Sequence, residues 1–324
     1  MQTSPSPLPD LRSLTLGLAS VFGHNGHTDN SVTILDRQPN NDKTTFPSEV
    51  VTCRLSDGRE LRLFCKYEAG RSHKVYGHRG DVAYEATVYR NVLTPLQTST
   101  PMFFGAYKDA QTGETWLVLE YLEQNIRVRE TPERVGMSQA AHWIGRFHAI
   151  NQARLLGEPI PDLTRYDVEY YRGWVHRTSL FAGHLHQRLP WLATVCEHFE
   201  EFVDYLLAAP PTIIHGEYCG KNVLSVRGVI YPIDWESAAI AAGEIDLASL
   251  AEGYSEKRVC QMGLAYQQAR WPDGTPAEFE RTLAAARLYL QFRWLGEKPK
   301  WTIDEDSFWR FEQLRVSAEQ LGLI

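Results

Sequence analysis

The chain of 324 residues is long enough for one large domain or two lobes, and its 43% hydrophobic and 23% charged residues are ordinary for a globular protein. A formal net charge of −7 argues against a nucleic-acid partner, which would require a basic surface. No apolar run is long enough to cross a membrane, and the segment 13–22 lacks the basic start of a signal peptide. Five scattered cysteines favour a reducing compartment, so we expect a cytoplasmic protein without a membrane partner.

The first half of the chain predicts a small, β-rich region. Residues 1–9 are rich in Ser and Pro and predict a disordered tail, which leads into a short helix with Asp10 as its N-cap. An amphipathic helix is expected over 80–93, where apolar residues recur on one face. Runs rich in β-branched and aromatic residues predict five strands, over residues 32–35, 49–55, 61–67, 102–107 and 116–121.

The second half of the chain has a helical pattern. Ser138 is expected to cap a helix that continues through Ala149, and further helices are expected across 182–208. A long helical segment is predicted over 257–324, and a short apolar hairpin is expected to turn at 227–228. A β-rich lobe followed by a larger α-helical lobe makes the predicted fold class α+β.

One polar segment interrupts the helical half and carries the candidate chemistry. It reads H-G-E-Y-C-G-K-N over 215–222, and I-D-W-E follows over 233–236. Phosphoryl transfer requires a carboxylate that orients the attacking hydroxyl and hard oxygen ligands that hold Mg²⁺ against the phosphates. Glu217 can supply the first function, and Asn222 and Asp234 can supply the second.

The spacing H-G-E-x-x-x-x-N followed by I-D-W-E is similar to that of the aminoglycoside phosphotransferase and choline kinase superfamily. The catalytic loop of this family usually reads H-G-D-x-x-x-x-N, so Glu217 is one methylene longer than the family's aspartate. The resemblance makes Glu217 the catalytic carboxylate, and we expect positioning by this residue to suffice for transfer. His215 belongs to the same catalytic loop and is a catalytic candidate beside Glu217; we expect it to brace the loop, with proton transfer as the alternative. A downstream D-L-A segment resembles the family's bracing aspartate at Asp246.

The first half of the chain supports the same resemblance. Lys66 closes the third predicted strand, as does the kinase lysine that contacts the α- and β-phosphates, and Glu85 resembles its partner on the following helix. The segment V-L-E-Y-L resembles the linker between lobes, where backbone groups near Glu120 and Leu122 would bind the nucleobase. The helical run 141–151 resembles the first long helix of the second lobe.

Two polar segments of the first half have alternative interpretations. The loop over 36–48 contains no glycine, so it is not the glycine-rich flap of protein kinases. Its polar residues Lys43, Thr44, Thr45 and Ser48 either offer phosphate contacts or are solvated. A basic stretch follows the third strand and consists of Arg71, His73, Lys74, His78 and Arg79. We expect this stretch to be a solvated loop, with contact to a nucleotide phosphate or an anionic substrate as the competing interpretation.

Aromatic and acidic residues alternate in one segment of the second half, where the family inserts helices that face the substrate. The aromatic residues are Tyr166, Tyr170, Tyr171 and Trp174, and the acidic residues are Asp162, Asp167 and Glu169. Helical spacing alone explains why the aromatic residues recur, so we expect most of them to pack in the core. An exposed face would instead suit an amine-bearing substrate, because carboxylates and aromatic rings both attract cations.

The resemblance implies a two-lobed, protein-kinase-like α+β fold, with a nucleotide-binding lobe over 10–122 and a catalytic and substrate-binding lobe over 123–324. It also implies a small-molecule kinase that uses Mg²⁺ and ATP or GTP. The acceptor would be a small hydroxyl-bearing molecule, with an aminoglycoside or another amine-bearing metabolite as candidates.

Two other functions fit part of the pattern. In a nucleotide-binding pseudokinase, Glu217 would mark lost catalysis, and the protein would have a regulatory or scaffolding role. Retention of Lys66, Asn222 and Asp234 argues against this alternative. A protein kinase is disfavoured because the sequence has neither the glycine-rich flap nor an A-P-E segment after Asp234.

Overall fold

The computed structural model describes residues 8–23, 31–40, 45–69, 77–131, 135–157 and 160–324. Most of the predicted disordered tail, residues 1–7, therefore lies outside the described residues. The chain divides into two compact units. Unit 1 comprises Met1–Lys74, Arg79–Asn125 and Tyr231–Glu236, and unit 2 comprises Val75–His78, Ile126–Ile230 and Ser237–Ile324.

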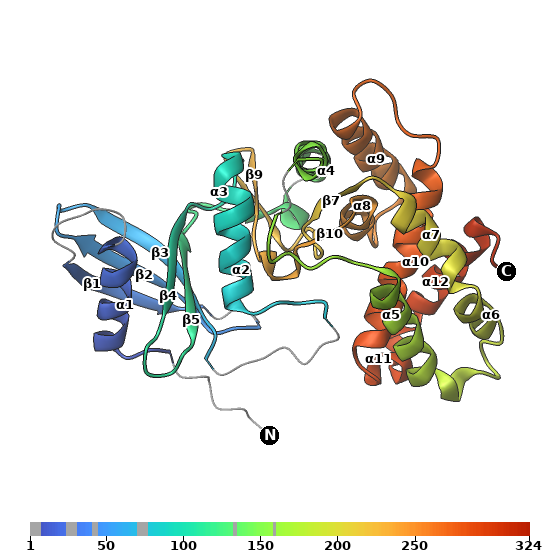
Figure 1. The fold of residues 1–324 in the computed structure, drawn as a ribbon, viewed down its shortest axis with the longest axis horizontal. Coiled ribbons are helices and arrows are strands. Elements are labelled where there is room, and N and C mark those ends of the chain that lie inside the picture. Colours follow the sequence, from blue (N-terminus) through green and yellow to red (C-terminus); the bar gives the residue numbers. More distant parts are fainter. Residues whose placement is uncertain (1–7, 24–30, 41–44, 70–76, 132–134, 158–159) are drawn as a thin grey trace. The chain divides into compact units, whose positions relative to one another are not determined.

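Unit 1 is built on a five-stranded antiparallel sheet in the order β1-β2-β3-β5-β4 (Figure 1). Its strands are β1 (Val32–Pro39), β2 (Ser48–Leu55), β3 (Glu60–Tyr67), β4 (Phe103–Lys108) and β5 (Thr115–Glu120). All five strands that the sequence predicted are present, and β1 is longer than predicted. Because β3 pairs with β2 on one side and β5 on the other, Lys66 lies on an interior strand opposite Ser48 and Leu117.

Helix α1 (Leu11–Gly23) packs its apolar face on this sheet. It begins where the sequence predicted, because the side chain of Asp10 accepts a hydrogen bond from the Ser13 backbone N–H at 2.8 Å. The core of unit 1 includes Leu14 and Leu18 from α1 together with Trp116 from β5. Gly17 is required at this contact, since an added Cβ would lie 2.4 Å from the Trp116 ring.

The helix predicted over 80–93 proves to be two kinds of helix. An α-helical part, α2 (Val82–Val88), is followed by a π-helical turn, η1 (Tyr89–Leu93), and by the short α3 (Thr94–Leu96). Thr94 donates to the Tyr89 carbonyl from its backbone N–H, which is the wider i→i−5 pattern, and its Oγ1 donates to the same carbonyl at 2.8 Å. Pro95 has no N–H to continue the α-helical ladder, which favours a wider turn here.

Unit 2 is mainly helical. Its helices are α4 (Val135–Leu155), α5 (Val168–Phe181), α6 (Trp191–Glu197), α7 (Phe199–Ala208), α8 (Glu244–Ala251), α9 (Glu256–Arg270), α10 (Phe279–Glu297), α11 (Lys300–Ile303) and α12 (Trp309–Leu321). Short 3₁₀ turns are η2 (Val128–Glu130), η3 (Gly183–Leu185), η4 (Trp235–Ser237) and η5 (Glu305–Ser307), with η4 beginning in unit 1. The predicted α+β fold class is confirmed.

Short strands in unit 2 frame the polar segment. They are β6 (Ile126–Arg127), β7 (Pro211–Ile214), β8 (Val223–Val226) and β10 (Ala239–Ala242), while β9 (Val229–Pro232) begins in unit 2 and ends in unit 1. Strands β7 and β10 form an antiparallel pair, and β8 lies between β6 and β9. The predicted hairpin at 227–228 is therefore present between β8 and β9.

Two helix predictions for unit 2 were wrong in their boundaries. Ser138 is not an N-cap, because α4 already includes Val135 and continues to Leu155. The predicted long helical segment over 257–324 is divided into α9, α10, α11 and α12. Pro272 and Pro299 lie between these helices, where a proline ends the backbone hydrogen-bond ladder.

Helix α10 forms the centre of unit 2. It packs against α5, α7, α8 and α12 (Figure 1). Most of its side chains are buried. Buried polar residues on such a helix require partners, and Arg293 and Glu297 lie near its C-terminal end. Among the described residues, no helix combines the length and apolar character needed to cross a membrane.

Candidate active site

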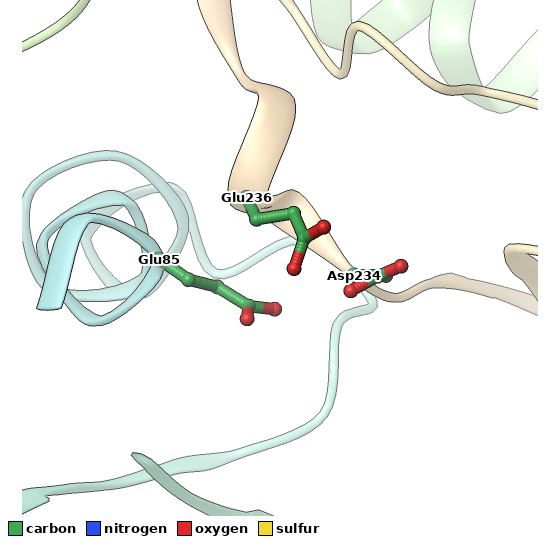
Figure 2. Close-up of side chains that lie close together, drawn as sticks. All are labelled: Glu85, Asp234 and Glu236. Carbon is green, nitrogen blue, oxygen red and sulfur yellow. The ribbon is translucent and has the colours of Figure 1, made fainter. Parts of the chain in front are cut away.

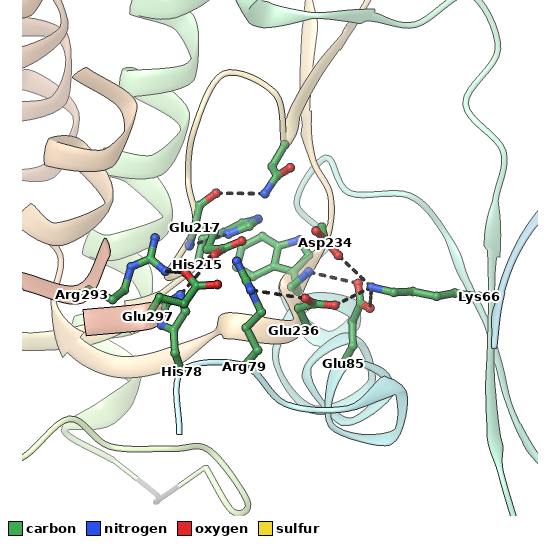
Figure 3. A network of polar contacts seen from close by, with 12 residues as sticks. Lys66, His78, Arg79, Glu85, His215, Glu217, Asp234, Glu236, Arg293 and Glu297 are labelled. Atoms are coloured by element: carbon green, nitrogen blue, oxygen red, sulfur yellow. Dashed lines mark hydrogen bonds and ion pairs between the residues drawn. The ribbon is translucent and has the colours of Figure 1, made fainter. Parts of the chain in front are cut away.

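A lysine and a set of carboxylates meet in unit 1. The Nζ atom of Lys66 lies 2.7 Å from Glu85 Oε2, 2.7 Å from Asp234 Oδ1 and 2.8 Å from Glu236 Oε2 (Figure 3). Arg79 adds a second cation, with its Nε atom 3.7 Å from Glu236 Oε1. Three carboxylates thus face two cations, which leaves an excess of negative charge when all the groups are ionised.

Local structure positions two acidic members of this cluster, Glu85 and Asp234. Asp81 caps α2 by accepting a hydrogen bond from the Tyr84 backbone N–H, and Glu85 follows in the first turn. Glu85 Oε1 in turn accepts a hydrogen bond from the Trp235 backbone N–H at 3.0 Å. Asp234 adopts the left-handed conformation, with φ of 68°, which is costly for a residue other than glycine and is concentrated at functional sites.

Burial and charge shift the pKa values of the cluster in opposite directions. Burial raises the pKa of Glu236 to about 8, and Asp234 acts in the same direction. Burial also raises the pKa of Glu85, against the effect of the Lys66 ammonium. Burial would lower the pKa of Lys66, but Asp234, Glu85 and Glu236 together raise it well above its ordinary value. Lys66 is therefore charged at every physiological pH.

The acidic members of the cluster fit a hard divalent cation. Glu85, Asp234 and Glu236 each offer one carboxylate oxygen, and these oxygens lie within 4.8 Å of one another (Figure 2). Oxygen ligands of this kind are those that Mg²⁺ prefers. The sequence predicted Asp234 as a metal ligand but missed Glu236, although the quoted I-D-W-E segment contained it. Asn222, the other predicted ligand, belongs to unit 2, and its role stays a prediction.

In unit 2, Asp246 holds the backbone of the predicted catalytic loop. Its carboxylate accepts hydrogen bonds from the N–H of His215 at 2.6 Å and from the N–H of Gly216 at 2.9 Å. His215 Nδ1 then accepts a hydrogen bond from the Glu217 N–H at 3.3 Å. These contacts hold the backbone of the loop in place, and the roles of His215 and Asp246 in the site stay predictions. Asn222 adds to these contacts, because its Nδ2 donates to the Glu217 carbonyl at 3.2 Å.

Gly216 can be only a glycine. Its φ of 82° lies in the left-handed region, where side chains are strained. An added Cβ would also lie 2.1 Å from the Ser237 carbonyl oxygen, which is part of the backbone and cannot move aside. The path of the loop immediately before Glu217 is therefore fixed by steric exclusion as well as by hydrogen bonds.

The carboxylate of Glu217 is buried among polar side chains. It is 4% exposed, and its Oε1 atom lies 3.2 Å from His78 Nε2 and 3.5 Å from Arg293 Nη1 (Figure 3). Arg293 Nη1 also lies 3.5 Å from Glu297 Oε2. Sequence reasoning missed Arg293 and Glu297, because nothing in a helical pattern distinguishes a buried arginine from a surface one.

The expectation of a solvated basic stretch was wrong for its described residues. His78 is 2% exposed, and its Nδ1 atom lies 3.3 Å from the Tyr170 hydroxyl within unit 2. Arg79 is largely buried and contacts Glu236 within unit 1. Both side chains have partners that compensate their burial, which charge counting along the sequence cannot reveal. Arg71, His73 and Lys74 lie outside the described residues, as do Lys43 and Thr44 of the preceding loop.

Beyond Asp246, a chain of buried polar groups crosses the core of unit 2. His148 Nε2 lies 3.1 Å from Asp246 Oδ2, and His148 Nδ1 lies 3.0 Å from the Tyr266 hydroxyl. Arg270 contacts the same hydroxyl and pairs with Glu244 at 3.1 Å. Burial lowers the pKa of His148, although the hydrogen bond to Asp246 opposes this shift. His148 is therefore neutral at pH 7.

The aromatic segment belongs mainly to the core, as expected. Tyr166, Tyr170, Tyr171 and Trp174 are each at most 8% exposed. Two of the acidic residues beside them have local roles. Asp167 caps α5 through the Tyr170 backbone N–H, and Glu169 pairs with Arg172 on the same helix. The Tyr170 hydroxyl, however, lies 2.9 Å from the Tyr289 hydroxyl and close to His78, so this core borders the surroundings of Glu217.

The predicted nucleobase contacts lie at the end of β5 in unit 1. Glu120 Oε2 accepts a hydrogen bond from the Met102 N–H at 3.1 Å, and the Glu120 N–H donates to the Met102 carbonyl at 2.9 Å. The Leu122 carbonyl accepts a hydrogen bond from Asn125 Nδ2 at 2.7 Å. These groups are hydrogen-bonded within unit 1, and their contact with a nucleobase stays a prediction.

The chain is similar to a known family in sequence and to several solved structures in fold. The model of the Phosphotransferase enzyme family matches residues 79–290. A protein from Ralstonia eutropha named as an aminoglycoside phosphotransferase is 12% identical, with a TM-score of 0.63 and 97% of each chain covered. Choline kinase from Cryptosporidium parvum is 13% identical, with a TM-score of 0.62, covering 97% of this chain and 98% of that chain. The GDP complex of an aminoglycoside 2′-phosphotransferase variant is 14% identical, with a TM-score of 0.59, covering 94% of this chain and 96% of that chain.

No curated protein sequence matches the chain. The solved structures are too distant in sequence to indicate more than the fold, which is the kinase-like fold that the sequence predicted. The family match covers more than half of the 324 residues and includes Glu85, the catalytic loop and Asp246. The chain therefore belongs to the Phosphotransferase enzyme family.

Proposed function

We propose that this protein transfers the γ-phosphate of ATP or GTP to a hydroxyl group of a small molecule, with Mg²⁺ as its cofactor. The observation that carries the proposal is the buried ammonium of Lys66, which lies 2.7 Å from both Glu85 and Asp234. A lysine held by a helix glutamate beside a metal-binding aspartate is the arrangement that kinases use for nucleotide phosphates. The GDP complex of a protein with a similar fold supports a nucleotide as the donor.

The residues of unit 1 would bind the donor. Lys66 remains protonated, so it would orient the phosphates as a fixed positive charge. Asp234, with a side chain 37% exposed, would hold Mg²⁺ together with Glu236 or Glu85. When bound, Mg²⁺ would neutralise charge on the phosphate oxygens. The predicted share of Asn222 in this site belongs to the same proposal.

In unit 2, Glu217 would align the acceptor hydroxyl and accept its proton late in transfer. Phosphoryl transfer has a loose transition state, so the placement of the nucleophile matters more than its early deprotonation. The loop contacts from Asp246, His215 and Asn222 would hold Glu217 in place. A carboxylate that is 4% exposed needs little reorganisation before it acts.

Two observations bear on the acceptor class. The names of proteins with similar folds include aminoglycoside phosphotransferase and choline kinase, so amine-bearing alcohols should be tested first. The aromatic segment around α5 does not itself favour an amine, because its rings are buried and Asp167 and Glu169 already have partners. Sugars and nucleosides therefore belong in the same screen.

One observation favours a nucleotide-binding pseudokinase as the second candidate. The Glu217 carboxylate contacts both His78 and Arg293, which compete with an acceptor hydroxyl for its oxygen. Such a protein would bind nucleotide without transferring phosphate. A cytoplasmic location is part of the proposal in either case, because all five cysteines are free, as a reducing compartment would keep them.

The test is Mg²⁺-dependent consumption of ATP and GTP with a panel of aminoglycosides, amino alcohols, sugars and nucleosides. We expect turnover that depends on one acceptor class and is abolished in Asp234→Ala. The matched control is Asp273→Ala, an exposed aspartate in the turn after α9 that should leave turnover unchanged. Full activity of Asp234→Ala would refute the metal assignment. Tight nucleotide binding without turnover on any acceptor would support the pseudokinase.

A further inference from the structure

We propose that Arg293 and His78 are positioning residues for the Glu217 carboxylate, and that the additional methylene of glutamate is what allows it to reach them. This inference rests on the proposed phosphotransfer by the same site. In this proposal, the length of the glutamate side chain is suited to its contacts with His78 and Arg293 in unit 2. An enzyme with aspartate at this position would be less active, although aspartate is the residue of the H-G-D pattern.

The backbone beneath Glu217 cannot move to compensate for a shorter side chain. The loop is fastened before Glu217 by the contacts of Asp246 with the His215 and Gly216 N–H groups, and Gly216 abuts the Ser237 carbonyl. It is fastened after Glu217 because the Glu217 carbonyl accepts hydrogen bonds from Cys219 N at 2.8 Å and Asn222 Nδ2 at 3.2 Å. The reach of the side chain alone therefore decides where the carboxylate lies.

Arg293 and His78, which contact the carboxylate, are each held in place by further side chains. Arg293 lies between two acids, because its Nη1 atom is 3.5 Å from both Glu217 and Glu297, and its guanidinium stacks over the Trp294 ring at 3.9 Å. His78 has its Nδ1 atom 3.3 Å from the Tyr170 hydroxyl. Since Arg293 is 2% exposed and belongs to the buried helix α10, it cannot follow a retreating carboxylate.

Replacing Glu217 by aspartate would withdraw the carboxylate by about 1.5 Å, the length of one C–C bond. The contact with Arg293 is already 3.5 Å long, so it would be lost, and the contact with His78 would lengthen beyond hydrogen-bonding range. Among the described residues, Arg293 would then retain Glu297 as its acidic partner. A carboxylate that has lost these two contacts is held less firmly, and a misplacement of about 1 Å at a reacting group can reduce the rate by on the order of 100-fold.

The kinetic test compares wild type with Glu217→Asp, Arg293→Gln and the double variant, using Mg-ATP and the acceptor found in the screen. We expect each single variant to lower kcat by roughly 10- to 100-fold with little change in the KM for nucleotide. The double variant should lose no more than Glu217→Asp alone, because the two changes remove one contact. Arg293→Lys should recover part of the activity, and His78→Asn should resemble Arg293→Gln. Arg281→Gln is the control, since this arginine of α10 is 64% exposed.

Two outcomes would overturn the inference: a Glu217→Asp enzyme as active as wild type, or losses that multiply in the double variant. A second measurement does not depend on turnover. Urea unfolding of Glu217→Gln, Arg293→Gln and their double variant should show a destabilisation of the double that is smaller than the sum of the singles; additive losses would refute the contact. If wild type transfers no phosphate to any acceptor, the proposed function fails, while this unfolding cycle still decides whether Arg293 anchors Glu217.

Discussion

Substitution of Asp246 by asparagine should be among the most destabilising isosteric changes in unit 2. The Asp246 side chain is fully buried, and its two oxygens accept hydrogen bonds from the N–H groups of His215 and Gly216. An asparagine keeps the shape but replaces one acceptor oxygen by an NH₂ group. One loop N–H would then face a donor, and His148 would lose part of its interaction with the acid.

The size of the effect follows from the bonds lost. A hydrogen bond to a charged group contributes about 1.5–3 kcal/mol, and leaving a buried N–H unsatisfied costs about 1–3 kcal/mol. Asp246→Asn should therefore destabilise unit 2 by roughly 3–5 kcal/mol, a large share of the ~5–15 kcal/mol that typically separates folded from unfolded protein.

Urea unfolding followed by tryptophan fluorescence would measure this loss. The control is Asp204→Asn in α7, where the aspartate is exposed and the change should stay within about 0.5 kcal/mol. If Asp246→Asn also stayed within 0.5 kcal/mol of wild type, the bracing role of the carboxylate would be refuted, whatever the activity of the variant.

Three further predictions concern single residues. Lys66→Met should weaken nucleotide binding, raising its Kd by ~10-fold or more, because the buried carboxylates would lose their central cation; calorimetry with Mg-ATP would show an unchanged Kd if this is wrong. Gly216→Ala should fail to fold normally or lose ~3 kcal/mol or more, since its Cβ meets a backbone oxygen, and a wild-type melting temperature would contradict this. The pKa of His148 is lower in the folded protein than in the unfolded chain. As the pH drops below about 6.5, the unfolded chain therefore binds a proton at His148 more readily than the folded protein, and the free energy of unfolding falls. A His148→Gln variant should lose less stability between pH 7 and 5 than wild type, by up to ~1.4 kcal/mol per pH unit, and equal slopes in urea unfolding would refute the assignment.

The sequence predicted the strands of unit 1 well because each is a local signal. Their β-branched and aromatic runs are short, bounded by turns, and stabilised mostly by neighbours in the same sheet. The π-helical turn after Val88 could not be predicted in this way, since the apolar spacing over 80–93 fits an α-helix almost equally well. The deciding details were a proline at 95 and the Tyr89 carbonyl, which no periodicity records.

Some residues of the candidate site could be predicted from the sequence, and others could not. Lys66 and Asp234 are 168 residues apart, and only the resemblance to a known family could place both in one site before the structure showed their contact at 2.7 Å. His78 and Arg293 had no such motif. Both are basic residues, and charge normally indicates a solvated surface. Their burial depends on acidic and hydroxyl partners that come from other parts of the chain, such as Glu217 and Tyr170.

The candidate metal ligand Asp234 and the candidate acceptor-aligning residue Glu217 differ in their exposure to solvent. Of the carboxylates around Lys66, the side chains of Glu85 and Glu236 are each 2% exposed, whereas that of Asp234 is 37% exposed. Under the proposed function, Asp234 is the acid that would take Mg²⁺ from solvent, while Glu85 and Glu236 also contact Lys66. Glu217 is 4% exposed and borders a histidine and an arginine, so its carboxylate is placed in advance. A site for a mobile cation and a site for a fixed carboxylate require opposite degrees of solvent access, and these exposures support the proposal that Asp234 binds the metal and Glu217 aligns the acceptor.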